Sequence, residues 1–345
     1  MEENQNTLIS VRHLSTVFPV KQTLFEKIQK KPQKAVRAVS DVSLDIRKGE
    51  TVGLVGESGC GKSTFARTLI RLCESNVGTI EYAGIGDLEK AGKKDLAKLH
   101  RKMQMIFQDP YSSLNPRMSI RAMFYEILSV YHLCEKKDYE KKTKEILEMV
   151  GMPQEVLDRR PSAFSGGQRQ RIGIARALVM NPEFLIADEP VSALDMSIQA
   201  QIINLLTDLK ERLRLTMLFI SHDLRVVRYI SDRVVVMYLG KIMEEGETES
   251  LFGRPGHPYT NILLHAAPVM NPEIRERSYT IEGETPSPID IPSGCLFHPR
   301  CPYAKEMCRK KIPELKEYRM KDGSVRKIAC HFPLGREELT DEAQA

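Results

Sequence analysis

The chain has 345 residues, of which 41% are hydrophobic and 28% charged, and its 51 basic and 46 acidic side chains give a net charge of +5. This length accommodates one large domain and a smaller one, and the composition is that of an ordinary globular protein rather than a disordered or fibrous one. No apolar run reaches the ~18 residues that span a bilayer, and the N-terminus lacks the basic-then-apolar order of a secretory signal. We therefore expect a soluble, cytoplasmic chain, and the mild positive charge alone does not indicate a nucleic-acid partner.

The predicted elements of the first half are short strands and one helix. In chain order they are strands over 8–11, 39–46 and 51–55 and a helix over 64–72. A basic stretch over 27–34 interrupts the strands and is predicted to be a solvated loop. Helical periodicity dominates from about 120 to 150. We therefore expect a helical insertion, about residues 112–165, between two halves of an α/β domain.

The second half of the chain alternates strands with helices. In chain order it shows a strand over 184–187, a helix over 197–212, a strand over 216–220 and a pair of strands within 233–245. This alternation favours a parallel sheet covered by helices on both faces. Past His265 a stretch rich in proline and charge predicts a linker as far as Pro292. We accordingly expect two domains, 1–270 and 271–345.

Residues Gly56 to Ser63 read G-E-S-G-C-G-K-S and fit the phosphate-loop pattern G-x-x-x-x-G-K-[ST], with an apolar strand before the loop and a helix after it. The glycines let backbone N–H groups wrap the phosphates. Lys62 places a positive charge on the outer phosphates, and the Ser63 hydroxyl can ligate Mg²⁺. The predicted nucleotide contacts here are Gly56, Ser58, Gly59, Cys60, Gly61, Lys62, Ser63 and Thr64.

Polar side chains also follow three other apolar strands. Asp188 and Glu189 end the strand over 184–187, where Asp188 can hold the Mg²⁺ shell while Glu189 orients and deprotonates an attacking water. His222 ends the next strand and is placed to reach the terminal phosphate. Gln108 opens the helical insertion and is placed to sense Mg²⁺ or water. Glu189, His222 and Gln108 are thus the predicted catalytic residues, with Ser63, Gln108 and Asp188 around Mg²⁺.

A second phosphate cradle lies about a hundred residues after the first. Ser165, Gly166, Gly167 and Gln168 stand at the mouth of a predicted helix. Ser can cap the helix, Gly lets a ligand approach the backbone, and the free N–H groups present positive potential. Because one nucleotide hardly needs two such cradles from one chain, we expect the second to serve a nucleotide held by another subunit.

Four of the seven cysteines crowd the last fifth of the chain: Cys295, Cys301, Cys308 and Cys330. In a cytoplasmic protein such a cluster predicts metal binding before disulfides. Four thiolates suit Zn²⁺ or an iron–sulfur cluster, although the C-x2-C pairs of zinc ribbons are absent; plain reduced cysteines are the alternative. Residues 295–336 are also basic, with 11 Lys or Arg against 4 Asp or Glu. A nucleic-acid-binding tail would share that charge, but without interleaved aromatic residues we expect no nucleic-acid partner.

Cys60 lies inside the phosphate loop itself. A helix N-terminus lowers the pKa of a thiol placed there, so Cys60 is a candidate redox brake. The alternative is that a small residue fits this position and has no further role. The sequence leaves both open.

Taken in chain order, the motifs described above resemble those of the ATP-binding subunits of ABC transporters. The resemblance covers roughly residues 7 to 335. The resemblance identifies Gly56 to Ser63 as the Walker A loop, Gln108 as the Q-loop, 184–189 as the Walker B strand and His222 as the switch histidine. It further identifies two motifs: Phe164 to Gln168 as the LSGGQ signature, with Phe164 where Leu is usual, and Ser192 to Asp195 as the D-loop, which adds Asp195 to the nucleotide contacts. The family stacks adenine on an N-terminal aromatic residue, for which Phe18 is our candidate.

The resemblance implies an α/β fold, that of a P-loop NTPase with an ABC-type nucleotide-binding domain. Its expected parts are a mixed or parallel sheet with helices, an antiparallel β subdomain, the helical insertion and a small Cys-rich C-terminal domain. It also implies an ATPase that uses ATP and Mg²⁺. Two ATPase subunits would close head to tail, each nucleotide being held by the phosphate loop of one chain and the signature of the other.

Two segments narrow the resemblance to oligopeptide, dipeptide and nickel importers. These are Gln108 to Arg117 and Gly256 to Thr260, while Phe18 to Lys21 with the following basic insertion is similar to the second ATPase subunit of such systems. The implied partners are a second ABC ATPase subunit, two integral membrane permease subunits and an extracytoplasmic solute-binding protein. The stretch Tyr111 to Pro116 and the helical insertion would receive a permease helix. The implied location is the cytoplasmic face of the membrane.

The same resemblance favours a [4Fe-4S] cluster at Cys295, Cys301, Cys308 and Cys330, with Zn²⁺ as the alternative. Two other functions remain open. One is a nickel or other small-solute importer, because the ATPase does not touch the solute. The other is a soluble ABC ATPase acting on nucleic acid or ribosomes, although such proteins typically join two ATPase cassettes or carry a long coiled coil.

Overall fold

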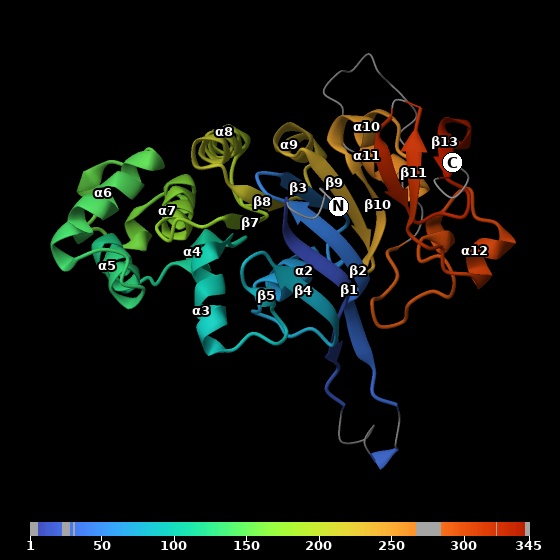
Figure 1. Cartoon of the computed structure of the whole chain (residues 1–345), viewed down its shortest axis with the longest axis horizontal. Coiled ribbons are helices and arrows are strands. Elements are labelled where there is room, and N and C mark those ends of the chain that lie inside the picture. Colours follow the sequence, from blue (N-terminus) through green and yellow to red (C-terminus); the bar gives the residue numbers. More distant parts are fainter. Residues whose placement is uncertain (1–5, 23–27, 30–31, 267–283, 322, 342–345) are drawn as a thin grey trace. The chain divides into compact units, whose positions relative to one another are not determined.

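The computed structural model describes residues 6–22, 28–29, 32–266, 284–321 and 323–341. The chain divides into two compact units (Figure 1). Unit 1 comprises Met1–Ile46, Val52–Lys90 and His222–Ala345, and unit 2 comprises Arg47–Thr51 and Ala91–Ser221.

Unit 1 contains a four-stranded sheet in the order β2-β1-β4-β5. Its strands are β1 (Thr7–Pro19), β2 (Ala35–Arg47), β4 (Val77–Tyr82) and β5 (Gly86–Asp87). β1 and β4 are antiparallel, with Ile9 opposite Tyr82 and Val11 opposite Ile80, and all four of these side chains are buried. β4 and β5 are also antiparallel. The antiparallel β subdomain expected from the sequence is therefore present.

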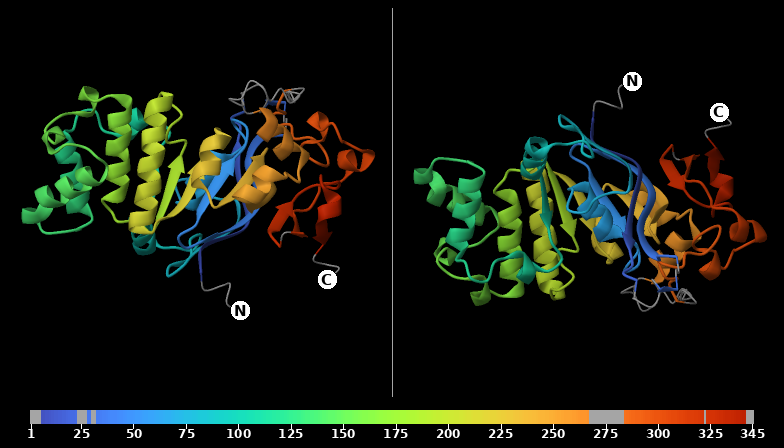
Figure 2. Two further views of the ribbon diagram at one scale, coloured as in Figure 1. Left: turned by 90° about the horizontal axis from the view of Figure 1, so that it is seen from above. Right: turned by 90° about the horizontal axis from the view of Figure 1, so that it is seen from below.

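The other strands of unit 1 follow the order β13-β11-β12-β10-β9-β3. They are β3 (Thr51–Val55), β9 (Arg233–Tyr238), β10 (Lys241–Glu247), β11 (Lys316–Met320), β12 (Val325–Ile328) and β13 (Leu339–Asp341). β3 and β9 are parallel, whereas β10 pairs antiparallel with both β9 and β12. The strands β11, β12 and β13 thus extend the sheet of unit 1 beyond β10. Figure 2 shows this C-terminal segment in orange and red. The structure does not confirm the Cys-rich C-terminal region as a domain of its own.

Helices cover the strands of unit 1. They are α2 (Lys62–Leu69), α9 (Leu224–Ile230), α10 (Thr248–Gly253), α11 (Pro258–Ala266) and α12 (Glu306–Lys310), with short 3-10 turns η5 (His298–Arg300) and η6 (Arg336–Glu338). Gly53 in β3 shows how closely α9 packs on the sheet. A Cβ at this position would lie 2.6 Å from Cγ1 of Val227 and 2.5 Å from Oγ of Ser231. Only glycine allows this close approach of helix and strand.

Unit 2 is built on three parallel strands, β6 (Met103–Ile106), β7 (Phe184–Asp188) and β8 (Thr216–Ile220). Every residue of β7 and β8 is buried, so neither strand shows the alternation of a half-exposed sheet. Continuous burial is typical of parallel strands covered on both faces. The strands predicted at 184–187 and 216–220 are confirmed.

The chain between β6 and β7, residues 107–183, consists of helices and the loops that join them, with no strand among these residues. Unit 2 contains α3 (Lys93–Lys102), α4 (Pro110–Ser113), α5 (Ile120–Val130), η2 (Lys136–Asp138), α6 (Tyr139–Met149), η3 (Gln154–Val156), η4 (Pro161–Ala163), α7 (Gly166–Leu178) and α8 (Met196–Leu213). Figure 1 shows α5, α6 and α7 gathered in green. A helical insertion was expected here; its limits at about 112 and 165 stay a prediction.

Some sequence-based predictions fall on segments that the structure describes only in part. The linker expected from 266 to 292, and with it the domain boundary at 270, lies largely outside the described residues. The same holds for part of the basic stretch 27–34 and for residues 342–345. Within the described part of the chain, no helix is both long and apolar enough to cross a membrane.

Candidate nucleotide-binding and hydrolysis site

The phosphate loop of unit 1 connects the fully buried β3 to α2. Its backbone turns through three glycines with positive φ, Gly56 (151°), Gly59 (77°) and Gly61 (105°). A Cβ at Gly56 would collide with the carbonyl oxygen of Met237, and one at Gly61 with that of Ala38. At Gly56 and Gly61 both the backbone conformation and the lack of space exclude a side chain. These glycines are therefore required for the structure of the loop, independently of phosphate binding.

Lys62 lies over this loop. Its ammonium donates hydrogen bonds to the carbonyl oxygens of Gly56 (2.8 Å) and Glu57 (2.9 Å), and the residue is only 5% exposed. A buried ammonium held by neutral carbonyls favours an anionic partner, and a phosphate would supply that charge. The N-terminus of α2 begins at Gly61, which offers no side-chain cap to its N–H groups. The loop therefore has the charge and the donors of a phosphate site.

The remaining loop residues differ in exposure. Ser58 and Gly59 are exposed, while Ser63 and Thr64 are half-buried. Cys60 is 3% exposed, and burial raises the pKa of its thiol although Lys62 opposes the shift. The argument for a redox brake required a lowered pKa, so this part of the sequence-based reasoning is wrong. The backbone of Cys60 instead helps to fix the loop: its N–H donates to the carbonyl of Glu57 (3.3 Å) and its carbonyl accepts from N of Gly240 (2.8 Å).

Unit 2 brings two of the predicted catalytic residues together. Gln108 follows β6 and Glu189 follows β7, and Nε2 of Gln108 donates a 2.9 Å hydrogen bond to Oε2 of Glu189. Because β6 and β7 are adjacent and parallel, their carboxyl ends meet at one edge of the sheet. The amide thus orients the carboxylate that was predicted to act on the attacking water.

The backbone of Glu189 is held in a left-handed conformation, with φ of 45°. Its N–H donates to the carbonyl of Ile220 at the end of β8 (2.9 Å), and its own carbonyl accepts from Oγ of Ser192 (3.1 Å). A non-glycine residue with this φ is strained and persists only where its neighbours fix it. Such strain at a candidate catalytic carboxylate fits a site built for function.

The residues predicted around Mg²⁺ have suitable donor chemistry. Asp188 is 1% exposed at the end of β7, so its carboxylate is surrounded by buried strand residues. Asp188, Gln108 and Ser63 each carry the kind of oxygen donor that Mg²⁺ prefers, and their common site stays a prediction. Asp188 and Gln108 belong to unit 2 and Ser63 to unit 1.

The signature residues form the start of α7. Ser165 caps the helix: its Oγ accepts from N of Gln168 (3.4 Å), and Oε1 of Gln168 accepts from N of Ser165 (3.1 Å). Phe164 is 5% exposed and anchors the helix entry, as its apolar side chain predicted. Gly167 is buried, and a Cβ there would lie 2.5 Å from Cγ2 of Ile198. Helix packing between α7 and α8 thus requires this glycine, a reason that the sequence did not reveal.

The D-loop residue Asp195 precedes α8, and the switch histidine His222 follows β8. Asp195 caps α8 by accepting from N of Ile198 (3.0 Å) and Oγ of Ser197 (2.8 Å), and these hydrogen bonds lower its pKa. His222 is exposed directly after β8. The predicted nucleotide contact of Asp195 and the phosphate contact of His222 stay predictions.

Phe18 lies near the end of β1 in unit 1 and is 42% exposed. Core packing, the alternative explanation for an aromatic residue in a strand, is therefore excluded. This exposure leaves part of the side chain accessible, and stacking on adenine stays a prediction.

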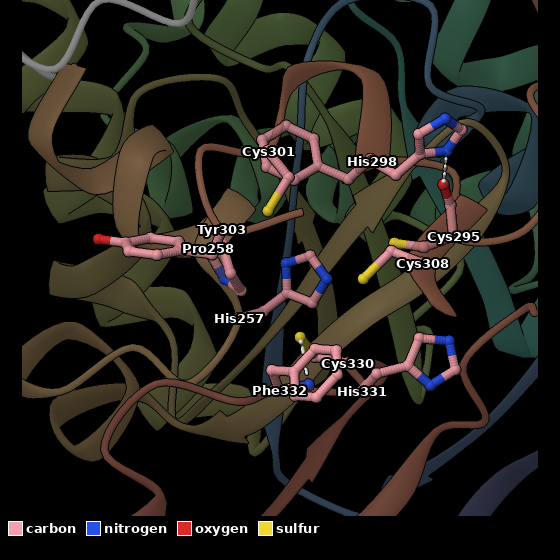
Figure 3. Close-up of a pocket in the computed structure, with 11 residues that line it drawn as sticks. His257, Pro258, Cys295, His298, Cys301, Tyr303, Cys308, Cys330, His331 and Phe332 are labelled. Carbon is pink, nitrogen blue, oxygen red and sulfur yellow. Dashed lines mark hydrogen bonds between the residues drawn. The ribbon is translucent and has the colours of Figure 1, made fainter. Parts of the chain in front are cut away.

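The four C-terminal cysteines line one pocket of unit 1 (Figure 3). The picture shows their sulfur atoms around the ring of His257, which is 1% exposed. Nδ1 of His257 accepts from N of Tyr259 (3.0 Å), which leaves the proton on Nε2, and Nε2 has no hydrogen-bond partner among the described residues. Residues 35 positions apart in the chain therefore line one pocket.

The pocket is closed around these side chains. Burial raises the pKa of Cys301 to about 11, that of Cys330 to about 12, and also that of Cys295. The free volume is about 10 Å³, roughly one water molecule. Among the described residues, no three His, Cys, Asp or Glu side chains converge on a metal-ion position. The donor types suit a metal centre, but the structure does not confirm one.

Sequence reasoning missed the roles of Glu57, which belongs to the phosphate loop, and of Arg300 and Tyr259, which contact it. Glu57 forms an ion pair with Arg300 (2.8 Å), and N of Glu57 donates to the hydroxyl of Tyr259 (3.0 Å). Arg300 lies 243 positions from Glu57 in the chain, so no local pattern could connect them. Tyr259 belongs to the Gly256–Thr260 segment, which was noted only for its resemblance to importer ATPases.

Two protein families match the chain. Residues 39–192 match the family described as ABC transporter, and residues 243–308 match the family described as oligopeptide/dipeptide transporter, C-terminal region. The first match spans the phosphate loop, the signature and the strand that ends in Asp188. The second covers three of the four C-terminal cysteines.

Similar proteins match over most of the chain. It is 48% identical to the oligopeptide transport ATP-binding protein AppF of Bacillus subtilis (strain 168) over 95% of this chain and 98% of that protein. It is 47% identical to a probable peptide ABC transporter ATP-binding protein of Sinorhizobium fredii over 94% of this chain and 90% of that one. A solved dimeric ATP-binding cassette in a post-hydrolysis state, bound to ADP and Pi, superposes with a TM-score of 0.60 at 26% identity. It covers 70% of this chain and 99% of the cassette.

Proposed function

Because the chain belongs to the family of ABC transporter ATP-binding proteins, we propose that it hydrolyses ATP to energise the import of oligopeptides or dipeptides. The observation that carries this proposal is the 48% identity over 95% of the chain to an oligopeptide transport ATP-binding protein. The separate match of residues 243–308 to the oligopeptide/dipeptide transporter C-terminal region supports the same substrate class.

In this proposal the predicted residues divide the work of binding and hydrolysis, and Gln108 has two tasks. The loop N–H groups and Lys62 bind the phosphates, and Glu189 takes a proton from the attacking water while Gln108 keeps its carboxylate oriented. His222 reaches the terminal phosphate. Mg²⁺ would be held by Asp188, Gln108 and Ser63, and when bound it neutralises phosphate charge. The 2.9 Å contact between Gln108 and Glu189 supports the pairing of these two roles.

We further propose that the active form is a head-to-tail pair with a second ABC ATPase subunit, a heterodimer. Ser165 to Gln168 would then contact the nucleotide held by the partner, with Asp195 at the same interface. Ser165 and Gln168 are exposed at the start of α7, which supports access to an outside ligand. The dimeric state of the similar solved cassette supports the same arrangement.

The membrane partners in this proposal are two permease subunits, supplied with peptide by an extracytoplasmic solute-binding protein. The chain would lie at the cytoplasmic face of the membrane. The surface that we assign to a permease helix includes Tyr111, which is 56% exposed while Arg169 of α7 stacks on its ring at 4.6 Å. An aromatic side chain that is both exposed and held in place suits a docking contact, and Arg169 would link that contact to the signature helix.

For the C-terminal region, residues 271–345, we propose a [4Fe-4S] cluster held by Cys295, Cys301, Cys308 and Cys330, with Zn²⁺ as the alternative. Their gathering around one buried, mostly apolar pocket supports this. The pocket volume is too small for a cluster, so the side chains would turn outward on loading. The unpartnered Nε2–H of His257 would then have an acceptor among the cluster or cysteine sulfurs.

The test of the proposed function is transport. The chain is purified with its second ATPase and two permease subunits, reconstituted into vesicles, and supplied with the solute-binding protein and either peptide or Ni²⁺. We expect ATP hydrolysis and uptake to be stimulated by peptide. Stimulation by Ni²⁺ alone, or purification with ribosomes or DNA instead of membrane subunits, would refute the peptide assignment.

The test of the cluster is anaerobic purification with iron, sulfide and zinc analysis. Iron and sulfide in equal amounts with visible absorbance are expected, and a Cys301→Ser variant should lose both. Cys73→Ser is the matched control, because Cys73 lies far from the pocket in sequence and does not line it. A colourless protein with one zinc per chain would overturn the iron–sulfur assignment.

A further inference from the structure

Arg300 connects the cysteine-lined pocket to the phosphate loop. It directly precedes Cys301, whose side chain lines the pocket, and its own side chain extends to the carboxylate of Glu57. Nη1 of Arg300 lies 2.8 Å from Oε2 of Glu57, and the two side chains are only 6% and 18% exposed. Glu57 is the second residue of the phosphate loop. This ion pair is therefore sheltered from solvent, and it joins two sites that are distant in the sequence.

The C-terminal segment holds the same carboxylate through a second residue. Oγ1 of Thr285 donates a 2.6 Å hydrogen bond to Oε2 of Glu57, and Nη1 of Arg300 also donates to Oγ1 of Thr285 at 3.3 Å. The hydroxyl of Tyr238, at the end of β9, accepts from Nη1 of Arg300 at 3.3 Å. Several hydrogen bonds thus fix the direction of the Arg300 side chain. A geometrically fixed guanidinium defines the position of its carboxylate partner.

Aromatic packing provides a second connection between the two sites. Phe297 lines the pocket and is fully buried, and its ring centroid lies 5.2 Å from that of Tyr259. The hydroxyl of Tyr259 accepts from N of Glu57 at 3.0 Å. Both the backbone and the side chain of Glu57 are therefore held by groups that pack against the pocket.

The position of Glu57 matters for phosphate binding. Its carbonyl accepts from Nζ of Lys62 at 2.9 Å, so a shift of Glu57 would move a partner of the phosphate-binding lysine. Its carboxylate is also a negative charge in a loop that is proposed to bind a triphosphate. Without Arg300, that charge would repel the phosphates at low local dielectric. Arg300 therefore both places the loop and neutralises it.

We propose that Arg300 is a positioning residue for the phosphate loop, through which the conformation of the cysteine-lined pocket affects nucleotide binding. The proposal rests on nucleotide binding by this loop, which is part of the proposed function. Arg300 does not contact the nucleotide; it acts through Glu57. Loss of Arg300 is expected to lower nucleotide affinity, because the Glu57 carboxylate would then be left without its cationic partner.

The experiment measures the affinity of the full chain for a fluorescent ATP analogue with Mg²⁺. Arg300→Met should weaken binding by roughly 5- to 150-fold, the usual range for coupled sites. Arg300→Lys, which keeps the charge, should recover part of the loss. Arg309→Met is the matched control: Arg309 is exposed and directly follows Cys308, as Arg300 precedes Cys301. It should bind like the wild type.

A double variant separates the charge effect from general damage. Glu57→Gln combined with Arg300→Met removes both members of the pair and should bind the analogue more tightly than Arg300→Met alone, because no unpaired carboxylate is left. Thermal unfolding of each variant shows whether the fold is kept. The proposal would be overturned if the folded Arg300→Met variant bound the analogue with wild-type affinity. It would also be overturned if the double variant bound the analogue no more tightly than Arg300→Met alone. Absence of binding by the wild type would instead refute the proposed function.

Discussion

Gln108 and Glu189 are joined by a 2.9 Å hydrogen bond in which the amide Nε2 of Gln108 donates to Oε2 of Glu189. The two residues are 81 positions apart and follow adjacent parallel strands. A carboxylate that is to accept a proton from water needs a fixed direction, and the amide gives it one without adding charge. The chain after Gln108 leads into α4 (Pro110–Ser113).

The first prediction concerns Glu189 as the base. Glu189→Gln should keep ATP binding but lower steady-state hydrolysis in the assembled complex by ~10²–10⁴, the usual size of a general-base contribution. Glu183→Gln is the control, because Glu183 directly precedes β7 and pairs with Lys102 on the surface. Hydrolysis at the wild-type rate by Glu189→Gln would exclude this role.

The second prediction compares two glycines of α7. Gly167→Ala should lower the free energy of unfolding by about 1–3 kcal/mol, because the new Cβ would lie 2.5 Å from Cγ2 of Ile198 and β-branched side chains have few rotamers in a helix. Gly173→Ala meets no atom within 4 Å and should raise stability by up to ~1 kcal/mol through helix propensity.

Urea unfolding of both variants measures this difference. Ile198→Ala combined with Gly167→Ala should recover part of the loss, since it removes the atom in conflict. Equal stability of Gly167→Ala and Gly173→Ala would show that packing between α7 and α8 does not require Gly167.

The third prediction concerns Cys60. Burial raises the pKa of its thiol, so at pH 7 to 8, ordinary for such assays, the protonated form dominates in the folded protein, and reaction should become faster only as the pH rises toward that higher pKa. Labelling with iodoacetamide followed by mass spectrometry should modify the half-exposed Cys73 before Cys60. Preferential labelling of Cys60 would restore the redox-brake hypothesis.

The fourth prediction concerns Phe18. If adenine stacks on its exposed ring, Phe18→Ala should weaken ATP binding by about 1–3 kcal/mol, the usual worth of a base stacked on an aromatic side chain. Phe18→Tyr keeps the ring and should bind nearly as the wild type does. Titration with ATP and with inorganic triphosphate separates the roles, since triphosphate has no base to stack. An equal loss for both ligands would contradict stacking.

The sequence by itself determined the residues of the phosphate loop, the signature and the strand that ends in Asp188. These motifs are local, because a strand, a tight turn and a helix N-terminus must follow one another within a few residues for the chemistry to work. The sequence also predicted the buried strands β7 and β8, because a short continuous apolar run is typical of a strand that is buried on both faces. The family relationship followed from the order of these motifs.

The tertiary structure decided the contacts between distant residues. The need for glycine at Gly167 comes from Ile198 on the next helix, and the high pKa of Cys60 comes from burial rather than from its place before a helix. The C-terminal strands joined the main sheet, because β12 pairs with β10. The pairing of Glu57 with Arg300 across 243 positions depends on that arrangement of the C-terminal segment. Local patterns carry no information on such pairs, since packing alone brings them together.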